Sequence, residues 1–156
     1  MEMPIPHDNS NIVSSWDVLN GQEVTGDCVV IGGGLVGAET AEYLANKGHQ
    51  VTIVEMMDKI AAGESTTVLP LMMKDFADHN VKQLVNTKVD HIENNIVYTA
   101  NDQIKADTII NALGSKKNIF DDSSITIPHV CVGDCSGERT ADIASAIRTA
   151  YKAANE

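Results

Sequence analysis

The hydrophobic positions of this chain form short continuous runs that alternate with segments of helical spacing. The runs are typical of buried parallel strands, and they lie at residues 28–31, 50–55, 81–85, 107–113 and 129–134. Three intervening segments carry apolar residues three or four positions apart, which predicts helices at residues 35–47, 65–79 and 139–152. Alternation of strands and helices predicts an α/β domain.

Residues 87–105 have a different pattern. Short alternating segments are separated there by turn residues, notably Asn94-Asn95 and Asn101-Asp102. This spacing predicts a small antiparallel meander.

Glycines follow the first apolar run in the G-x-G-x-x-G spacing, at Gly32, Gly34 and Gly37. Gly32 would permit a tight turn out of the strand, and Gly34 would let a diphosphate approach the backbone. Gly37 would let the next helix pack closely on the sheet. A helix starting near Leu35 directs free N–H groups and the positive end of its dipole at that phosphate. These features predict a dinucleotide site.

An acid ends the second strand at the expected place. Glu55 lies 55 − 37 = 18 residues beyond the last glycine, close to the roughly 20 expected for the carboxylate that binds a ribose 2′-hydroxyl. A carboxylate repels a 2′-phosphate, so Glu55 favours NAD over NADP, although the nearby Lys59 keeps NADP as an alternative. A glycine turn beside an unrelated surface acid is the other interpretation.

The expected architecture is therefore a three-layer Rossmann-like FAD/NAD(P)-binding fold. Its parallel sheet has the order 3-2-1-4-5, with strands numbered along the chain and residues 129–134 as the fifth. Helices cover one side, and the meander forms a further layer. Residues 1–26 are expected to be a lead-in linker with apolar anchors such as Ile12-Val13, and residues 27–156 the dinucleotide-binding domain.

Composition narrows the class of protein. With 156 residues and 43% hydrophobic residues, the chain is long and apolar enough for one globular domain. A formal net charge of −11 argues against a nucleic-acid partner. The apolar runs are far shorter than the ~20 residues of a membrane helix, and the N-terminus does not resemble a secretory signal. We expect a cytoplasmic protein with no membrane partner.

Cysteine and histidine spacing adds little chemistry. The three cysteines are expected to be reduced, with Cys28 inside the first strand, and Cys131 and Cys135 do not form a C-x-x-C pair. The five histidines are scattered, so the sequence predicts no metal site.

Four segments together resemble the pyridine-nucleotide-dependent flavoprotein oxidoreductases. They are Val-Val-Ile-Gly-Gly-Gly-Leu-Val-Gly-Ala-Glu-Thr-Ala-Glu-Tyr-Leu at 29–44, Val-Thr-Ile-Val-Glu-Met at 51–56, Ala-Leu-Gly at 112–114 and Val-Gly-Asp-Cys at 132–135. Within that family the chain most resembles the C-terminal, NAD-binding part of the 2,4-dienoyl-CoA reductase and 2-enoate reductase group, which are NADH:flavin oxidoreductases. The resemblance extends from about residue 10 to residue 152, and includes Trp16-Asp-Val-Leu19 as the linker before the NAD domain.

The resemblance implies roles for individual residues. Glu39 would lie near the nicotinamide where it meets the flavin, or be a plain exposed helix acid. Asp134 would bind the ribityl chain of FAD, or serve as a helix N-cap or turn residue. No residue is predicted to be catalytic, and the candidate cofactor-binding residues are Gly32, Gly33, Gly34, Leu35, Val36, Gly37, Glu39, Glu55, Met56, Ala112, Leu113, Gly114, Gly133 and Asp134.

The resemblance implies further domains in the full-length members of this group. They would begin with a barrel that carries FMN and an iron–sulfur cluster, and continue into an FAD half with its own glycine motif. Only one such motif occurs here, and 156 residues cannot form a barrel as well as a nucleotide domain. The expected partners are thus a dinucleotide and the missing flavin and barrel domains, and residues 115–156 correspond to the return into the FAD half.

Two functions follow as hypotheses. The first is an NADH-binding module, inactive alone, of an enzyme that passes hydride from NADH to flavin to reduce activated C=C bonds such as those of 2-enoates or dienoyl-CoA. The second is a stand-alone binding or interaction domain for a dinucleotide, either NAD or FAD, with no catalysis of its own.

Overall fold

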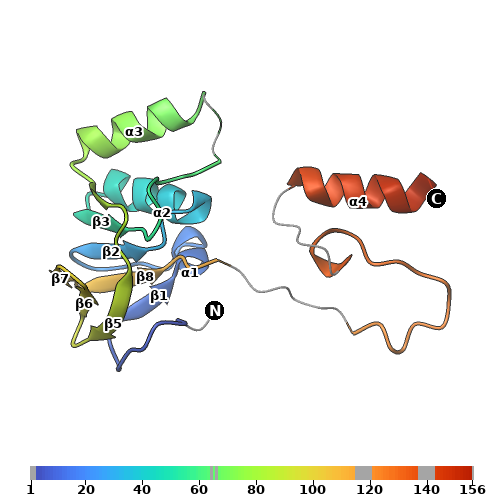
Figure 1. The fold of residues 1–156 in the computed structure, drawn as a ribbon, viewed down its shortest axis with the longest axis horizontal. Coiled ribbons are helices and arrows are strands. Elements are labelled where there is room, and N and C mark those ends of the chain that lie inside the picture. The colour runs from blue at the N-terminus through green and yellow to red at the C-terminus, as the bar shows by residue number, and fades with distance from the viewer. Residues whose placement is uncertain (1–2, 64, 66, 115–120, 137–142, 156) are drawn as a thin grey trace. The chain divides into compact units, whose positions relative to one another are not determined.

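The computed structural model describes residues 3–63, 65, 67–114, 121–136 and 143–155, without the side chains of Asp134 and Ser136. The chain divides into two compact units, Met1–Gly114 and Ser115–Glu156. The first unit contains the glycine motif and both sheets (Figure 1).

A five-stranded parallel sheet forms the centre of the first unit, in the order β1-β8-β2-β3-β4. Its strands are β1 (Ile12–Ser14), β2 (Cys28–Ile31), β3 (Val51–Val54), β4 (Lys82–Leu84) and β8 (Thr108–Asn111). β2 lies between β8 and β3, and all four of its residues are buried. This central position explains why its sequence is continuously apolar rather than alternating.

The expected strand order is confirmed for four strands, but the identity of the fifth is wrong. β1 from the lead-in segment, not residues 129–134, pairs with β8, with Ile12 opposite Ile109. Residues 129–132 are irregular, and Gly133–Ser136 form a short 3₁₀ helix in the second unit. The three residues of β1 are too few to show the alternating pattern that predicts a strand. β1 exists because the open edge of β8 supplies its hydrogen bonds, such as Ile109 N–H to the Asn11 carbonyl (2.9 Å).

Three helices, α1 (Ser15–Leu19), α2 (Leu35–Asn46) and α3 (Leu69–Asp78), form the layer on one face of the sheet (Figure 1). On α2 the buried side chains are mostly small, including Ala38, Ala41 and Ala45. Small side chains bring the helix axis close to the sheet, where Leu44 and Val30 join the same core. As predicted, Gly48 follows the helix with positive φ (+92°).

The opposite face carries the antiparallel meander, as predicted. Its strands follow the order β5-β6-β7 and lie at β5 (Val89–Glu93), β6 (Ile96–Thr99) and β7 (Gln103–Lys105). Val29 and Ile31 of β2 pack with meander residues Ile92 and Val97 in a second core. The three-layer arrangement of helices, parallel sheet and meander is thereby confirmed.

Cys28 lies inside β2, as expected, and is buried. Burial raises the pKa of its thiol to about 11, and the neighbouring carboxylates of Asp27 and Asp107 add to the rise. A thiol that stays protonated at neutral pH is a weak nucleophile. Cys28 therefore acts as a core residue.

The second unit contains the short 3₁₀ helix and helix α4 (Ile143–Asn155). The Gly133 N–H donates to Thr149 Oγ1 (2.9 Å), which ties the two helices together. The predicted start of this helix at residue 139 lies outside the described residues, as does the side chain of Asp134. Among the helices of the described part, none combines the length and the hydropathy needed to cross a membrane.

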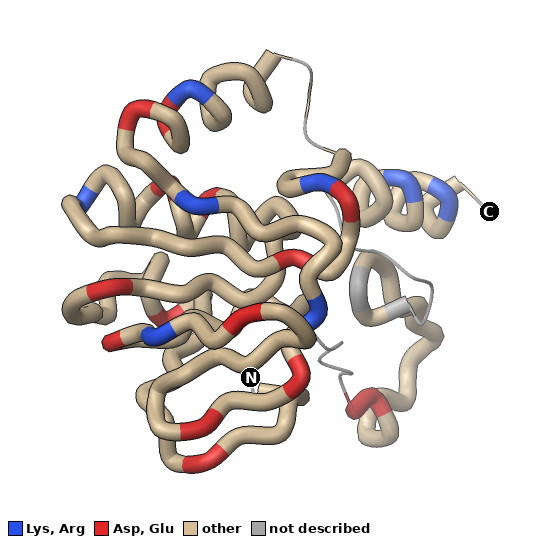
Figure 2. The backbone as a smooth tube through the Cα atoms, turned by 60° about the vertical axis from the view of Figure 1, so that its left-hand side comes forward, with Lys and Arg blue, Asp and Glu red and all other residues tan. Residues whose placement is uncertain are grey.

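Charged residues are not gathered into one patch of the first unit. Figure 2 shows acidic positions on its helices, on the meander and in the segments that join the parallel strands, with basic positions between them. Two of these acids, Glu42 on α2 and Asp75 on α3, lie near one another. Burial, the neighbouring Asp75 carboxyl and the charge of Glu39 raise the pKa of Glu42.

We expect the Glu42→Gln substitution to stabilise the protein at neutral pH. An acid whose pKa is raised in the folded state loses stability as pH rises from the unfolded value of 4.5 through the folded pKa. A neutral amide should recover roughly 0.2–0.5 kcal/mol, the usual cost of a like-charge pair between helical neighbours. Thermal unfolding from pH 4 to pH 8 should show a gain at pH 7 that disappears below about pH 4.5. Glu93→Gln, on an exposed meander position, is the control; an equal gain there would contradict the explanation.

Candidate dinucleotide-binding site

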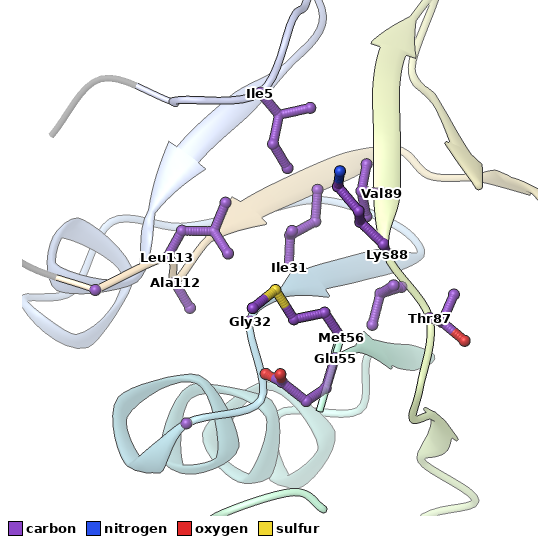
Figure 3. Close-up of a pocket in the computed structure, with 13 residues that line it drawn as sticks. Ile5, Ile31, Gly32, Glu55, Met56, Thr87, Lys88, Val89, Ala112 and Leu113 are labelled. Carbon is purple, nitrogen blue, oxygen red and sulfur yellow. The ribbon is translucent and has the colours of Figure 1, made fainter. Parts of the chain in front are cut away.

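A pocket of about 390 Å³ lies at the carboxyl ends of β2, β3 and β8 (Figure 3). The chain runs from β2 to β3 on one side and reaches β8 on the other, so the pocket sits where the strand order reverses. Open α/β sheets bind their ligands at this switch point. Its lining residues are Ile5, Ile31, Gly32, Gly34, Val54, Glu55, Met56, Thr87, Lys88, Val89, Ala112, Leu113 and Gly114.

Two of the motif glycines are required by the geometry of the backbone. Gly32 has φ +101°, and a Cβ there would lie 2.7 Å from the carbonyl oxygen of Ala112. A Cβ on Gly37 would lie 1.9 Å from the carbonyl oxygen of Gly32. Neither neighbour can move away, because both are backbone atoms of the core. The predicted tight turn at Gly32 and close helix packing at Gly37 are thus confirmed.

Gly34 is different, because a Cβ there would meet no atom within 4 Å. It is the N-cap of α2, with φ −64° and ψ −176°, and no side chain caps this helix end. The first turn of α2 contains no acidic residue, so no side chain of this turn opposes an anion at the positive end of the helix. Open space beside uncapped N–H groups fits a diphosphate.

Glu55 lies directly after β3, and its carboxylate faces the glycine turn (Figure 3). Oε2 accepts a hydrogen bond from the Gly33 N–H (2.6 Å), and Oε1 accepts one from the Met57 N–H (2.7 Å). The carboxylate therefore belongs to the pocket wall and does not turn away from it. Its contact with a ribose stays a prediction.

The predicted site residues fall into three groups. Seven line the pocket, namely Gly32, Gly34, Glu55, Met56, Ala112, Leu113 and Gly114. Five lie in or just after the turn without lining it, namely Gly33, Leu35, Val36, Gly37 and the exposed Glu39. Gly133 and Asp134 belong to the second unit.

Six lining residues were not among the site residues predicted from the sequence: Ile5, Ile31, Val54, Thr87, Lys88 and Val89. Ile31 and Val54 are the last residues of β2 and β3. Thr87 reaches the pocket because its N–H bonds the carbonyl of Glu55 (2.9 Å), which holds the segment after β4 beside the end of β3. Lys88 stands next to it on the opposite wall from the glycine turn (Figure 3). No local motif marks Ile5 or residues 87–89, since they reach the pocket only through tertiary packing.

A parallel sheet, a glycine turn at its switch point and an acid after the next strand are together typical of dinucleotide-binding domains. Residues 3–132 match the pyridine nucleotide-disulphide oxidoreductase family, and the chain belongs to this family. The resemblance drawn from the sequence motifs is thereby confirmed.

Individual relatives support the same class of flavoprotein oxidoreductase. A bilirubin reductase of Mediterraneibacter gnavus is 44% identical over 97% of this chain and 24% of its own length. A cinnamate reductase of Clostridium sporogenes is 30% identical over 92% of this chain and 23% of its own. A structure of 2-naphthoyl-CoA reductase in complex with 2-naphthoyl-CoA matches with a TM-score of 0.81 and 28% identity, over 97% of this chain and 24% of that one. The chain thus spans about a quarter of these relatives.

Proposed function

We propose that this chain is the NADH-binding module of a flavin-dependent oxidoreductase that reduces activated C=C bonds, such as those of 2-enoates or dienoyl-CoA. The observation that carries the proposal is the open position at Gly34, where an uncapped helix end meets a pocket at the strand ends. The family supports a pyridine nucleotide and FAD as cofactors. Relatives whose names refer to cinnamate and 2-naphthoyl-CoA support a conjugated substrate for the parent enzyme.

Different residues of the pocket would bind different parts of the nucleotide. The first turn of α2 and the open side of Gly34 would hold the diphosphate. Glu55 would accept hydrogen bonds from the adenosine ribose, and Ile31, Val54 and Val89 give an apolar wall for the remaining surface. Bound there, the nicotinamide would supply a hydride and the flavin would accept it, while this chain supplies binding and orientation.

The remaining parts of the parent enzyme would supply the substrate site. We propose Glu39 as a positioning residue beside the nicotinamide, and Gly133 and Asp134 as contacts of FAD. FMN and an iron–sulfur cluster would belong to a barrel domain outside this chain. The module is expected to work in the cytoplasm and to turn over little or no substrate alone.

Titration of the purified chain with NADH, NADPH and FAD tests the proposal. We expect NADH to bind at least about tenfold more tightly than NADPH, because Glu55 repels a 2′-phosphate. Calorimetry or the fluorescence of the reduced nicotinamide measures both affinities. Equal binding of NADPH would refute the argument from Glu55, and a preference for FAD would favour the stand-alone FAD domain instead.

A further inference from the structure

The glycine turn is hydrogen-bonded at three places to the end of β3 and the segment that follows it. The Gly32 N–H donates to the Val54 carbonyl (2.9 Å), and the Ala61 N–H donates to the Gly33 carbonyl (2.7 Å). The third bond runs from the Gly33 N–H to Oε2 of Glu55 (2.6 Å) and joins residues 22 positions apart. It differs from the other two in being made by a side chain, so a substitution can remove it.

Gly33 is closely packed against the same segment. A Cβ there would lie 2.5 Å from Cδ1 of Ile60 and 3.0 Å from Cβ of Glu55. The amide of Gly33 therefore faces Glu55 and not the open space beside Gly34, so the diphosphate must use the amides at the start of α2. What Gly33 contributes is a fixed connection between the turn and the acid.

Glu55 has enough acceptors for this connection and for a sugar. An ionised carboxylate offers about four lone-pair positions. The Gly33 and Met57 amides take one on each oxygen, at 2.6 Å and 2.7 Å. One position on each oxygen is left for ribose hydroxyls, and the two amides fix the plane in which those positions lie.

We propose that Glu55 is a positioning residue for the glycine-rich turn, which its carboxylate holds through the Gly33 N–H before any nucleotide binds. This role rests on the proposed nucleotide site and extends it. Because the two amides also hold the carboxylate, it cannot swing aside for a 2′-phosphate without breaking both bonds. Discrimination against NADPH is then built into the ligand-free turn.

Amide hydrogen exchange in the ligand-free protein tests the first half of the proposal. In Glu55→Ala, the Gly33 and Met57 amides should both exchange at least about tenfold faster than in the wild type, while amides of β2 and β3 are unchanged. Glu55→Gln keeps the shape of the side chain but only one acceptor oxygen, so one of the two amides should lose its protection. This variant tests the role of Glu55 if the alanine variant does not fold. Glu93→Gln is the control. Wild-type exchange at both amides in the Glu55 variants would overturn the proposal.

Titration with ADP and 2′,3′-dideoxy-ADP tests the second half. A positioning role means that Glu55→Ala, or Glu55→Gln, weakens both ligands, because the turn that binds the diphosphate is no longer fixed. If Glu55 acted only on the ribose hydroxyls, the variant would weaken ADP and leave 2′,3′-dideoxy-ADP unchanged, which would overturn the proposal. If the wild type binds neither ADP nor NADH, the proposed function fails, and amide exchange still decides the role of Glu55 in the turn.

Discussion

Gly34→Asp is expected to stabilise the protein and at the same time abolish NADH binding. The backbone at Gly34 already has the extended conformation of an N-cap, and nothing lies within 4 Å of the new Cβ. An aspartate there can accept hydrogen bonds from the N–H groups of the first turn, which is worth a few tenths of a kcal/mol relative to glycine at the N-cap. The same carboxylate takes the amides that the diphosphate needs and repels it. We expect NADH affinity to fall at least about 100-fold, equivalent to about 2.7 kcal/mol.

Thermal unfolding and NADH titration on the same samples measure the two effects. Gly34→Asn is the matched variant, because it caps the helix without adding charge. Its affinity should lie between those of the wild type and Gly34→Asp. Retained NADH affinity in the aspartate variant, together with a raised unfolding temperature, would move the nucleotide away from this helix end and contradict the proposed site.

Strong local signals in the sequence were sufficient to predict most strands and helices of the first unit. The run at Cys28–Ile31 could only be a strand buried on both faces, and the glycine spacing dictated the turn after it. The pair Asn94-Asn95 correctly marked the turn between two meander strands, and both residues adopt positive φ (+52° and +59°). Such features are local, so tertiary packing confirms them and does not override them.

The errors and omissions share one physical cause, which is that they depend on contacts between distant segments. β1 is a strand only beside β8, 97 residues later, as the pairing of Ile12 with Ile109 shows. Of the six unpredicted lining residues, Ile5 and Thr87 to Val89 reach the pocket by packing around the end of β3. The sequence placed Glu55 at the site, but its bonds to Gly33 and Met57 could be seen only once the turn was built.

Gly37→Ala is expected to destabilise the fold by about 1–2 kcal/mol, although alanine is the best helix former. The new methyl carbon would lie 1.9 Å from the carbonyl oxygen of Gly32 and 3.1 Å from Cβ of Ala112. Overpacking of this kind costs roughly 1–3 kcal/mol, and here the obstacle is a backbone atom that moves only if α2 or the turn shifts. A gain of about 1 kcal/mol in helix propensity offsets only part of that cost.

Urea unfolding measures the free energy of unfolding of Gly37→Ala and of Gly34→Ala. Both variants carry the same chemical change, a glycine replaced by alanine, in the same turn. The second substitution meets no atom within 4 Å, so it should cost less than about 1 kcal/mol, the difference between glycine and alanine as an N-cap. Gly37→Ala should also weaken NADH, because any shift of α2 moves the amides that face the diphosphate. Equal stability of the two variants would mean that α2 is not held against the turn as closely as the 1.9 Å approach requires. The close packing of helix on strand, and with it the position of the proposed diphosphate site, would then have to be revised.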